Sequence, residues 1–388
     1  MASALFVNLH SSYPSILFQL KKMINRLLHL TILSIFSASV VFAQIDSNQI
    51  FYKRFESDSD TMIVQANFIQ LAEKLSGNYE LSVIDQETKT VEVDGYIDEG
   101  NQAVISKLGH NDPVFKGVFL DDRFTGIWNP GKSGKEIELL ERYPEGSIPL
   151  SIYYLRSETN LVDGETDSPT AEIELTVLYP DSSYRQDTVI QNIEQIINRH
   201  FINTENYLLH PDSLLILTEN AFYTLYKELN TDWHDSGSSF DWLKETSMSV
   251  TYNSNYILCL EYLDYVYSGG AHGMTNLSYD IFNLKTGKTL DFHDFFMEGS
   301  SEKLTEILTL QIRSDKQIPD SIPLTKAGYF IDKIKPGNNI YMNGSGIGFV
   351  YNPYEIAPYS TGITNIFIDY NQLAGLLNEN APLNKTIK

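Results

Sequence analysis

Histidine and cysteine side chains are the residues that most often bind metals or act as nucleophiles, and their spacing here indicates neither role. No two histidines beyond residue 43 lie four residues apart, and the zinc-binding pattern His-Glu-x-x-His does not occur. Cys259, the one cysteine, lies in an apolar run typical of a buried, unreactive thiol, and a Gly-x-Ser-x-Gly nucleophile motif is missing. We therefore predict no catalytic residue, no metal site and no cofactor. The histidines concerned are His110, His200, His210, His234, His272 and His293.

The acidic residues are too numerous to identify a catalytic pair. The chain has 50 Asp and Glu against 28 Lys and Arg, which gives a formal net charge of −22. Such a field repels nucleic acid and anionic lipid and attracts a cationic partner. The alternative is that the charge only keeps the surface soluble.

Two aromatic segments rich in glycine or proline stand out as a candidate binding surface. In the first, a strand-like run ends in a Gly-Gly turn with a single histidine; the second, residues 349–359, is aromatic and broken by prolines. Glycines in such a turn permit positive φ and bring bare backbone to the surface. We interpret the two segments as one conformationally fixed surface, and the alternative is a turn packed under an aromatic loop. The candidate residues are Tyr267, Gly269, Gly270, His272, Tyr351, Tyr354, Glu355 and Tyr359.

The N-terminal region has the layout of a secretory signal peptide. A basic segment at residues 21–26 precedes an apolar run at residues 27–41, and Ala43 ends a cleavage pattern. An apolar run of about 15 residues is shorter than a typical membrane span. We predict a signal peptide over residues 1–43, with Met23 as a second candidate start, and a soluble protein in the periplasm or outside the cell without stable membrane insertion. The alternative is an uncleaved anchor.

The rest of the chain divides by pattern into a β-rich part and a mixed part. We expect a lead-in segment over 44–76 with a short helix at 63–74, an antiparallel β-rich meander domain over 77–156, and a linker over 157–169. Within the meander, Gly117 and Gly126 each follow an aromatic residue by two positions, which predicts strands where a ring approaches a glycine. Helical spacing at 189–201, 211–229, 302–312 and 372–378, among strands, predicts an α+β fold for the remainder.

The second half resembles a known pair of envelope domains. Residues 267–273, the hairpin at 283–288 with the following 294–296, and residues 349–359 resemble the RsiV-like C-terminal domain. That domain is found in the lysozyme-sensing anti-sigma factor RsiV and in PdaC-type peptidoglycan deacetylases. The resemblance covers about residues 170–380, as a PdaC-like companion domain over 170–245 and an RsiV-like domain over 246–388. It implies an α+β envelope module that binds a protein or a glycan.

Two activities of the similar proteins do not carry over. The sequence shows no sigma-binding segment ahead of a membrane helix, and no deacetylase domain with its Asp-His-His set. Our leading hypothesis is an exported, non-catalytic binding module of the cell envelope that recognises a cationic protein such as a lysozyme, or peptidoglycan. One alternative is a hydrolase or deacetylase of envelope glycans that uses Glu355 or another acid with His272. Another is a structural or assembly protein whose aromatic loop only packs.

Overall fold

The structure is a computed structural model and describes most of the chain beyond the N-terminal region. It covers residues 49–383 except 59–61, 130–132, 166, 182, 184–186, 203–207, 232, 234–239 and 380. The predicted signal peptide over 1–43, including Met23, lies outside these residues. No helix within the described ranges is long and apolar enough to cross a membrane.

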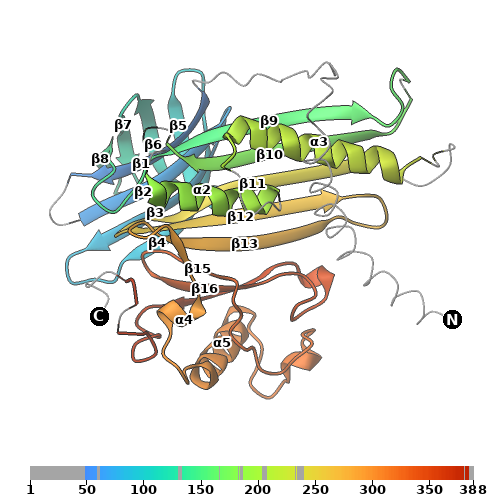
Figure 1. Cartoon of the computed structure of the whole chain (residues 1–388). Helices are drawn as coiled ribbons and strands as arrows, with labels where there is room; N and C mark the ends of the chain where they lie inside the picture. Colours follow the sequence, from blue (N-terminus) through green and yellow to red (C-terminus); the bar gives the residue numbers. More distant parts are fainter. Residues whose placement is uncertain are drawn as a thin grey trace.

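An eight-stranded antiparallel barrel forms the first part of the fold (Figure 1). Each strand pairs with the next, and the first pairs with the last, so the barrel has an up-and-down topology. Its strands are β1 (Ile50–Ser57), β2 (Met62–Leu71), β3 (Lys74–Val83), β4 (Lys89–Ile97), β5 (Gln102–Lys107), β6 (Pro113–Leu120), β7 (Arg123–Trp128) and β8 (Lys135–Glu141).

Aromatic side chains fill the barrel interior. Phe68 and Phe115 meet edge to face, with ring centroids 6.3 Å apart, and Phe115 meets Phe124 in the same way at 6.0 Å. A Cβ added to Gly117 would lie 2.7 Å from the ring of Phe124, so this glycine makes room for the ring. The expected approach of an aromatic ring to a glycine is confirmed.

The expected helix over 63–74 is wrong, because these residues form β2 and the start of β3. Val64, Ala66 and Phe68 alternate along β2 and face the barrel interior. Ile69 points the other way and packs into the neighbouring core. Burial on both faces hides the period of two in the sequence, which explains the wrong prediction.

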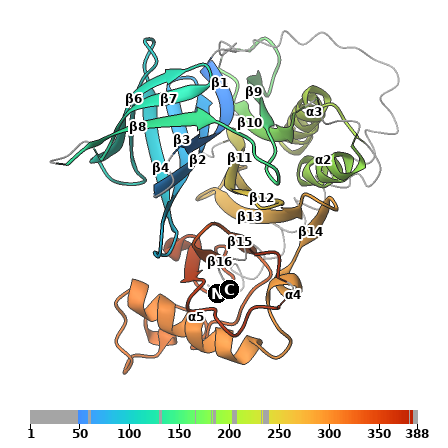
Figure 2. The same cartoon turned by 90° about the vertical axis from the view of Figure 1, so that its left-hand side faces the viewer.

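A six-stranded sheet lies beside the barrel and has cores on both faces (Figures 1 and 2). Its order is β14-β13-β12-β11-β10-β9; β10 and β11 are parallel, and the other neighbours are antiparallel. Helices α2 (Thr188–Phe201) and α3 (Pro211–Leu229) connect the parallel pair and cover one face. The strands are β9 (Leu150–Asn160), β10 (Thr170–Pro180), β11 (Trp242–Ser254), β12 (Ile257–Tyr267), β13 (Met274–Asn283) and β14 (Lys288–Leu290).

The C-terminal residues cover the opposite face of this sheet. Helix α5 (Ser301–Asp315) and a small sheet pack there, with the short helices α4 (Phe292–Phe295), η3 (Leu324–Lys326) and η4 (Tyr359–Thr361). The small sheet contains β15 (Ile340–Met342), β16 (Gly346–Tyr351) and β17 (Thr364–Asp369). The α+β class, with a β-rich antiparallel part followed by a mixed part, is confirmed. The expected closing helix over 372–378 consists of turns and one bridge instead.

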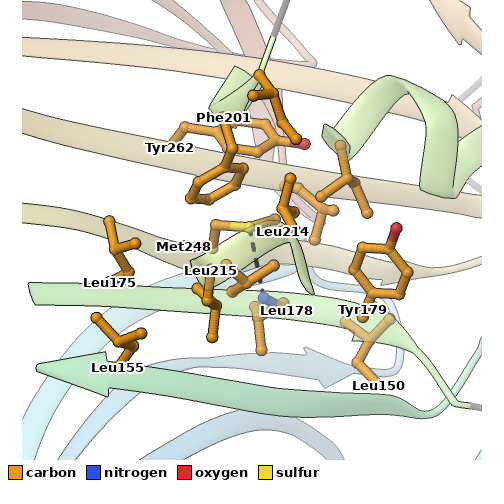
Figure 3. Packing of buried hydrophobic residues seen from close by; sticks show 14 of the residues in the cluster. Leu150, Leu155, Leu175, Leu178, Tyr179, Phe201, Leu214, Leu215, Met248 and Tyr262 are labelled. Carbon is orange, nitrogen blue, oxygen red and sulfur yellow. Dashed lines mark hydrogen bonds between the residues drawn. The ribbon is translucent and has the colours of Figure 1, made fainter. Parts of the chain in front are cut away.

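A β-bulge in β11 changes which positions of this strand face each core. The register with β12 shifts between Val250 and Tyr252, leaving Thr251 as the extra residue. Val250 therefore packs under the helices while Tyr252 packs into the C-terminal core. Figure 3 shows the helix-side core, where the Met248 sulfur accepts a hydrogen bond from the Leu178 amide at 3.4 Å.

The strand boundaries differ from the expected segment boundaries. Strands β1 and β2 lie within residues 44–76, which we expected to be a lead-in. Strand β9 begins inside the expected 77–156 domain and runs into the expected linker, where Ser157 pairs with Ile173 of β10. This end of β9 is polar because it forms the edge of the sheet. A polar segment of this kind has the composition of a linker, which explains the expected boundary.

A buried asparagine fastens the barrel to the six-stranded sheet. Asn253, at the end of β11, accepts a hydrogen bond from the Ile148 amide at 3.0 Å and donates to the Ile148 carbonyl at 2.7 Å. Its amide also donates to the Tyr52 hydroxyl of β1 at 2.8 Å. The backbone carbonyl of Asn253 accepts from the Arg54 side chain at 3.1 Å. The two parts are thus joined by directional bonds away from water.

Candidate functional site

Three aromatic rings from the two predicted segments stack on one another. The rings of His272 and Tyr359 are nearly parallel, at 15°, with centroids 3.8 Å apart. Tyr354 stacks on Tyr359 in turn, with ring centroids 6.0 Å apart. We call His272, Tyr359 and Tyr354 the aromatic stack. It joins the turn after β12 to the loop after β16, which are far apart in the sequence.

The aromatic stack reaches the protein surface. Tyr354 is 37% exposed, His272 is exposed and Tyr359 is half-buried. Phe330 adds apolar surface nearby, because its amide donates to the Ile356 carbonyl at 2.8 Å and its side chain is 53% exposed. The loop therefore does more than pack inward. Phe330 was not among the predicted residues, and its sequence surroundings gave no signal for it.

The Gly-Gly turn fixes the position of His272. Gly269 and Gly270 have φ values of 84° and 93°, and the Tyr267 hydroxyl donates to the Gly270 carbonyl at 3.1 Å. The Nδ1 atom of His272 lies 2.9 Å from the Gly273 carbonyl oxygen. Because a carbonyl only accepts, Nδ1 carries the proton, and Nε2 of the neutral ring remains an acceptor for a ligand.

A side-chain amide holds the second segment against the large sheet. The Asn352 oxygen accepts from the Leu277 amide at 2.8 Å, and its nitrogen donates to the Leu277 carbonyl at 3.0 Å. Asn352 thus takes the place of a neighbouring strand at this point of β13. We did not predict this residue, although an Asn-Pro step directly after a strand is a turn signal.

The remaining predicted residues take structural positions. Tyr351 is buried, its hydroxyl donates to the Lys335 carbonyl at 2.5 Å, and burial raises its pKa. Glu355 is exposed, and its carboxylate accepts the Asn352 amide at 3.1 Å. Within the part of the chain that the structure describes, Glu355 and His272 make their hydrogen bonds with backbone groups and not with each other. The structure therefore brings together His272, Tyr354 and Tyr359, with Tyr267, Gly269 and Gly270 supporting them.

Two large hollows lie elsewhere, both at the barrel. The first, of about 820 Å³, lies between the barrel and the C-terminal residues and includes Glu80. The second, of about 1180 Å³, lies between the barrel and the β9–β10 edge and includes Tyr96 and Arg156. The aromatic stack lines neither of them. Within the ranges that the structure describes, no group of three or more His, Cys, Asp or Glu side chains has the arrangement of a metal site.

Comparison with protein families identifies the second half of the chain. Residues 166–275 match the family model described as Deacetylase PdaC, and residues 293–371 match that described as Protein of unknown function (DUF3298). The two matches are consistent with a PdaC-type and DUF3298 domain pair in this region. The resemblance expected from the sequence is thereby confirmed.

A solved structure of the DUF3298 family resembles part of the chain in fold. A member from Bacteroides fragilis NCTC 9343 is 22% identical, with a TM-score of 0.54, over 60% of this chain and 96% of that one. A DUF3298 family protein from Pseudomonas aeruginosa PAO1 is 18% identical, with a TM-score of 0.41, over 61% and 98%. No curated protein matches the chain.

Removing the amide of Asn352 is expected to loosen the aromatic stack. Asn352→Ala deletes both hydrogen bonds to Leu277 and should lower the free energy of unfolding by roughly 1–3 kcal/mol. The His272 ring protons should then lose the upfield NMR shift that the Tyr359 ring causes. Asn365→Ala, which removes one side-chain bond to Tyr341, is the control. Unchanged His272 shifts in Asn352→Ala would contradict the positioning role.

Proposed function

We propose that this protein is an exported, non-catalytic binding module of the cell envelope that holds peptidoglycan on the aromatic stack. The supporting observation is the exposure of stacked rings on a backbone fixed by Gly269, Gly270 and Asn352. Aromatic faces offer a flat apolar surface to a sugar ring, and their polar edges offer hydrogen bonds. Tyr354, Tyr359 and His272 provide both.

A second candidate function is recognition of a cationic protein such as a lysozyme. It is supported by the net charge of −22, which would speed the encounter and make it sensitive to salt. A hydrolase or deacetylase using Glu355 with His272 has less support, because the Glu355 carboxylate is engaged by the backbone of its own loop.

Peptidoglycan binding is tested by substituting the aromatic stack. The purified protein should co-sediment with insoluble peptidoglycan, and Tyr359→Ala should weaken this binding roughly tenfold or more, since Tyr359 contacts both other rings. Tyr96→Ala removes an exposed tyrosine from the barrel and is the matched control.

The outcomes separate the candidate functions. Equal binding by Tyr359→Ala and the unsubstituted protein would contradict the stack as the site. Absence of peptidoglycan binding, together with salt-sensitive binding of lysozyme, would favour the second candidate. Release of soluble products from labelled peptidoglycan would favour an enzyme.

A further inference from the structure

The hollow between the barrel and the C-terminal residues has walls from three parts of the fold. Strands β2 and β3 and their following turn provide one wall, the end of β11 provides another, and the residues around β16 and β17 close it. Figure 2 shows the barrel reaching toward β15 and β16 on this side. A hydrogen bond of 2.9 Å from Asn371 to Glu87 links the two sides at the rim.

The walls of this hollow carry negative charge without a neutralising base. Four carboxylates line it, Glu80, Asp85, Glu87 and Asp369, and none of the other lining residues is Lys, Arg or His. Burial, followed by repulsion from Glu87, raises the pKa of the Asp369 carboxyl. Glu87 therefore disfavours the ionised form of Asp369.

Glu80 is the buried member of the four. Its residue is 8% exposed, and its Oε1 atom accepts the Gly344 amide at 2.8 Å. Its Oε2 atom accepts no hydrogen bond from any residue that the structure describes, although the side chain lines the hollow. Burial raises the pKa of Glu80 to about 7, while the Gly344 amide and Arg54 lower it. Glu80 thus has an unused acceptor facing an acidic space.

Arg54, the cation whose charge lowers the pKa of Glu80, makes its hydrogen bonds with other groups. Its guanidinium pairs with Glu56 at 3.0 Å and donates to the carbonyls of Arg142 at 2.9 Å and Asn253 at 3.1 Å. It also does not line the hollow. Two tyrosines, Tyr252 and Tyr370, also line the hollow. Burial raises the pKa of each phenol, so both are neutral.

We propose that this hollow binds a lysine or arginine side chain from a basic peptide segment of a partner protein. A volume of about 820 Å³ admits such a side chain with its flanking backbone. The ammonium or guanidinium group supplies the donors that Glu80 Oε2 and the rim carboxylates lack. The inference deepens the cationic-partner function proposed above by giving it a site, and it is separate from the aromatic stack.

A labelled trilysine peptide tests the site by fluorescence anisotropy with the purified protein. Glu80→Gln and the double variant Glu87→Gln/Asp369→Asn should each bind the peptide roughly tenfold more weakly. Both changes keep a side-chain oxygen, so the bonds from Gly344 and Asn371 can persist. Glu298→Gln/Glu302→Gln changes the net charge as much as the double variant does, at exposed residues outside the hollow, and should bind within about twofold of the unsubstituted protein.

Three results would overturn the proposal. These are no binding of the peptide, equal binding by the hollow variants, and an equal loss in Glu298→Gln/Glu302→Gln, which would indicate a general charge effect. Near-ultraviolet circular dichroism checks that each variant is folded. If Glu80→Gln does not fold, the double variant Glu87→Gln/Asp369→Asn still tests the proposal. Lysozyme binding without trilysine binding would refute this site while leaving the cationic-partner function standing.

Discussion

Asn253→Ala is expected to lower the free energy of unfolding by roughly 3–5 kcal/mol, because it removes hydrogen bonds from several buried polar groups at once. The substitution leaves the Ile148 amide, the Ile148 carbonyl and the Tyr52 hydroxyl without the partner that Asn253 supplies. Asn253 is 2% exposed, so water does not replace these bonds. Urea denaturation followed by circular dichroism measures the loss.

A matched asparagine provides the control for this experiment. Asn371→Ala removes a single exposed hydrogen bond to Glu87 and is expected to change the unfolding free energy by less than about 1 kcal/mol. If Asn253→Ala costs no more than Asn371→Ala, the junction does not depend on the buried amide. A large loss would show that the barrel and the sheet are stabilised through this contact.

Glu80→Gln is expected to stabilise the protein in alkaline solution and to have little effect in acid. Burial raises the pKa of Glu80 from 4.5 to about 7 in the folded state. The unfolded chain therefore loses this proton first, and the favourable contribution of protonated Glu80 is lost as the pH rises from about 4.5 to about 7. Glutamine stays neutral and avoids the loss. One pKa unit corresponds to about 1.4 kcal/mol, so the gain near pH 8 is at most about 3 kcal/mol.

The groups around Glu80 determine the size of this effect. Arg54 favours the charged carboxylate and the Gly344 amide does the same, whereas burial opposes it more strongly. The pKa values of the neighbouring Tyr252 and Tyr370 are raised in part by Glu80 itself. Chemical denaturation at several pH values should show the variant and the unsubstituted protein converging in acid. Glu298→Gln, at an exposed position, should show no such divergence. A loss of stability near pH 8 in Glu80→Gln would contradict the expected sign.

The fold could be predicted where each element buries a single face. Strands β6 and β7 place their phenylalanines in the barrel interior, and helices α2, α3 and α5 carry one apolar face each, so their patterns are readable in the sequence. Strand β2 was misread because Phe68 and Ile69 are buried in different cores. Barrel closure depends on the pairing of β1 with β8, which no local pattern encodes.

The candidate site was predictable only as two separate segments. The Gly-Gly turn and the aromatic loop stand out by composition, but the stacking of His272 on Tyr359 depends on tertiary packing. The Asn352 contact joins residues 75 positions apart, and the Glu80 contact with Gly344 joins residues 264 positions apart. Residues so far apart in the sequence meet only in the complete tertiary structure, so the acidic hollow could not be inferred from the sequence.

The burial of both faces of β11 and β12 has a consequence for where the chain can be divided. The two family matches end at residue 275 and begin at residue 293, as if two modules followed one another. Strands β11 and β12, however, form a wall of both hydrophobic cores. A fragment truncated at either match boundary would present one of these faces bare to water. Strands β9 through β17 therefore have to stay together for both cores to remain covered.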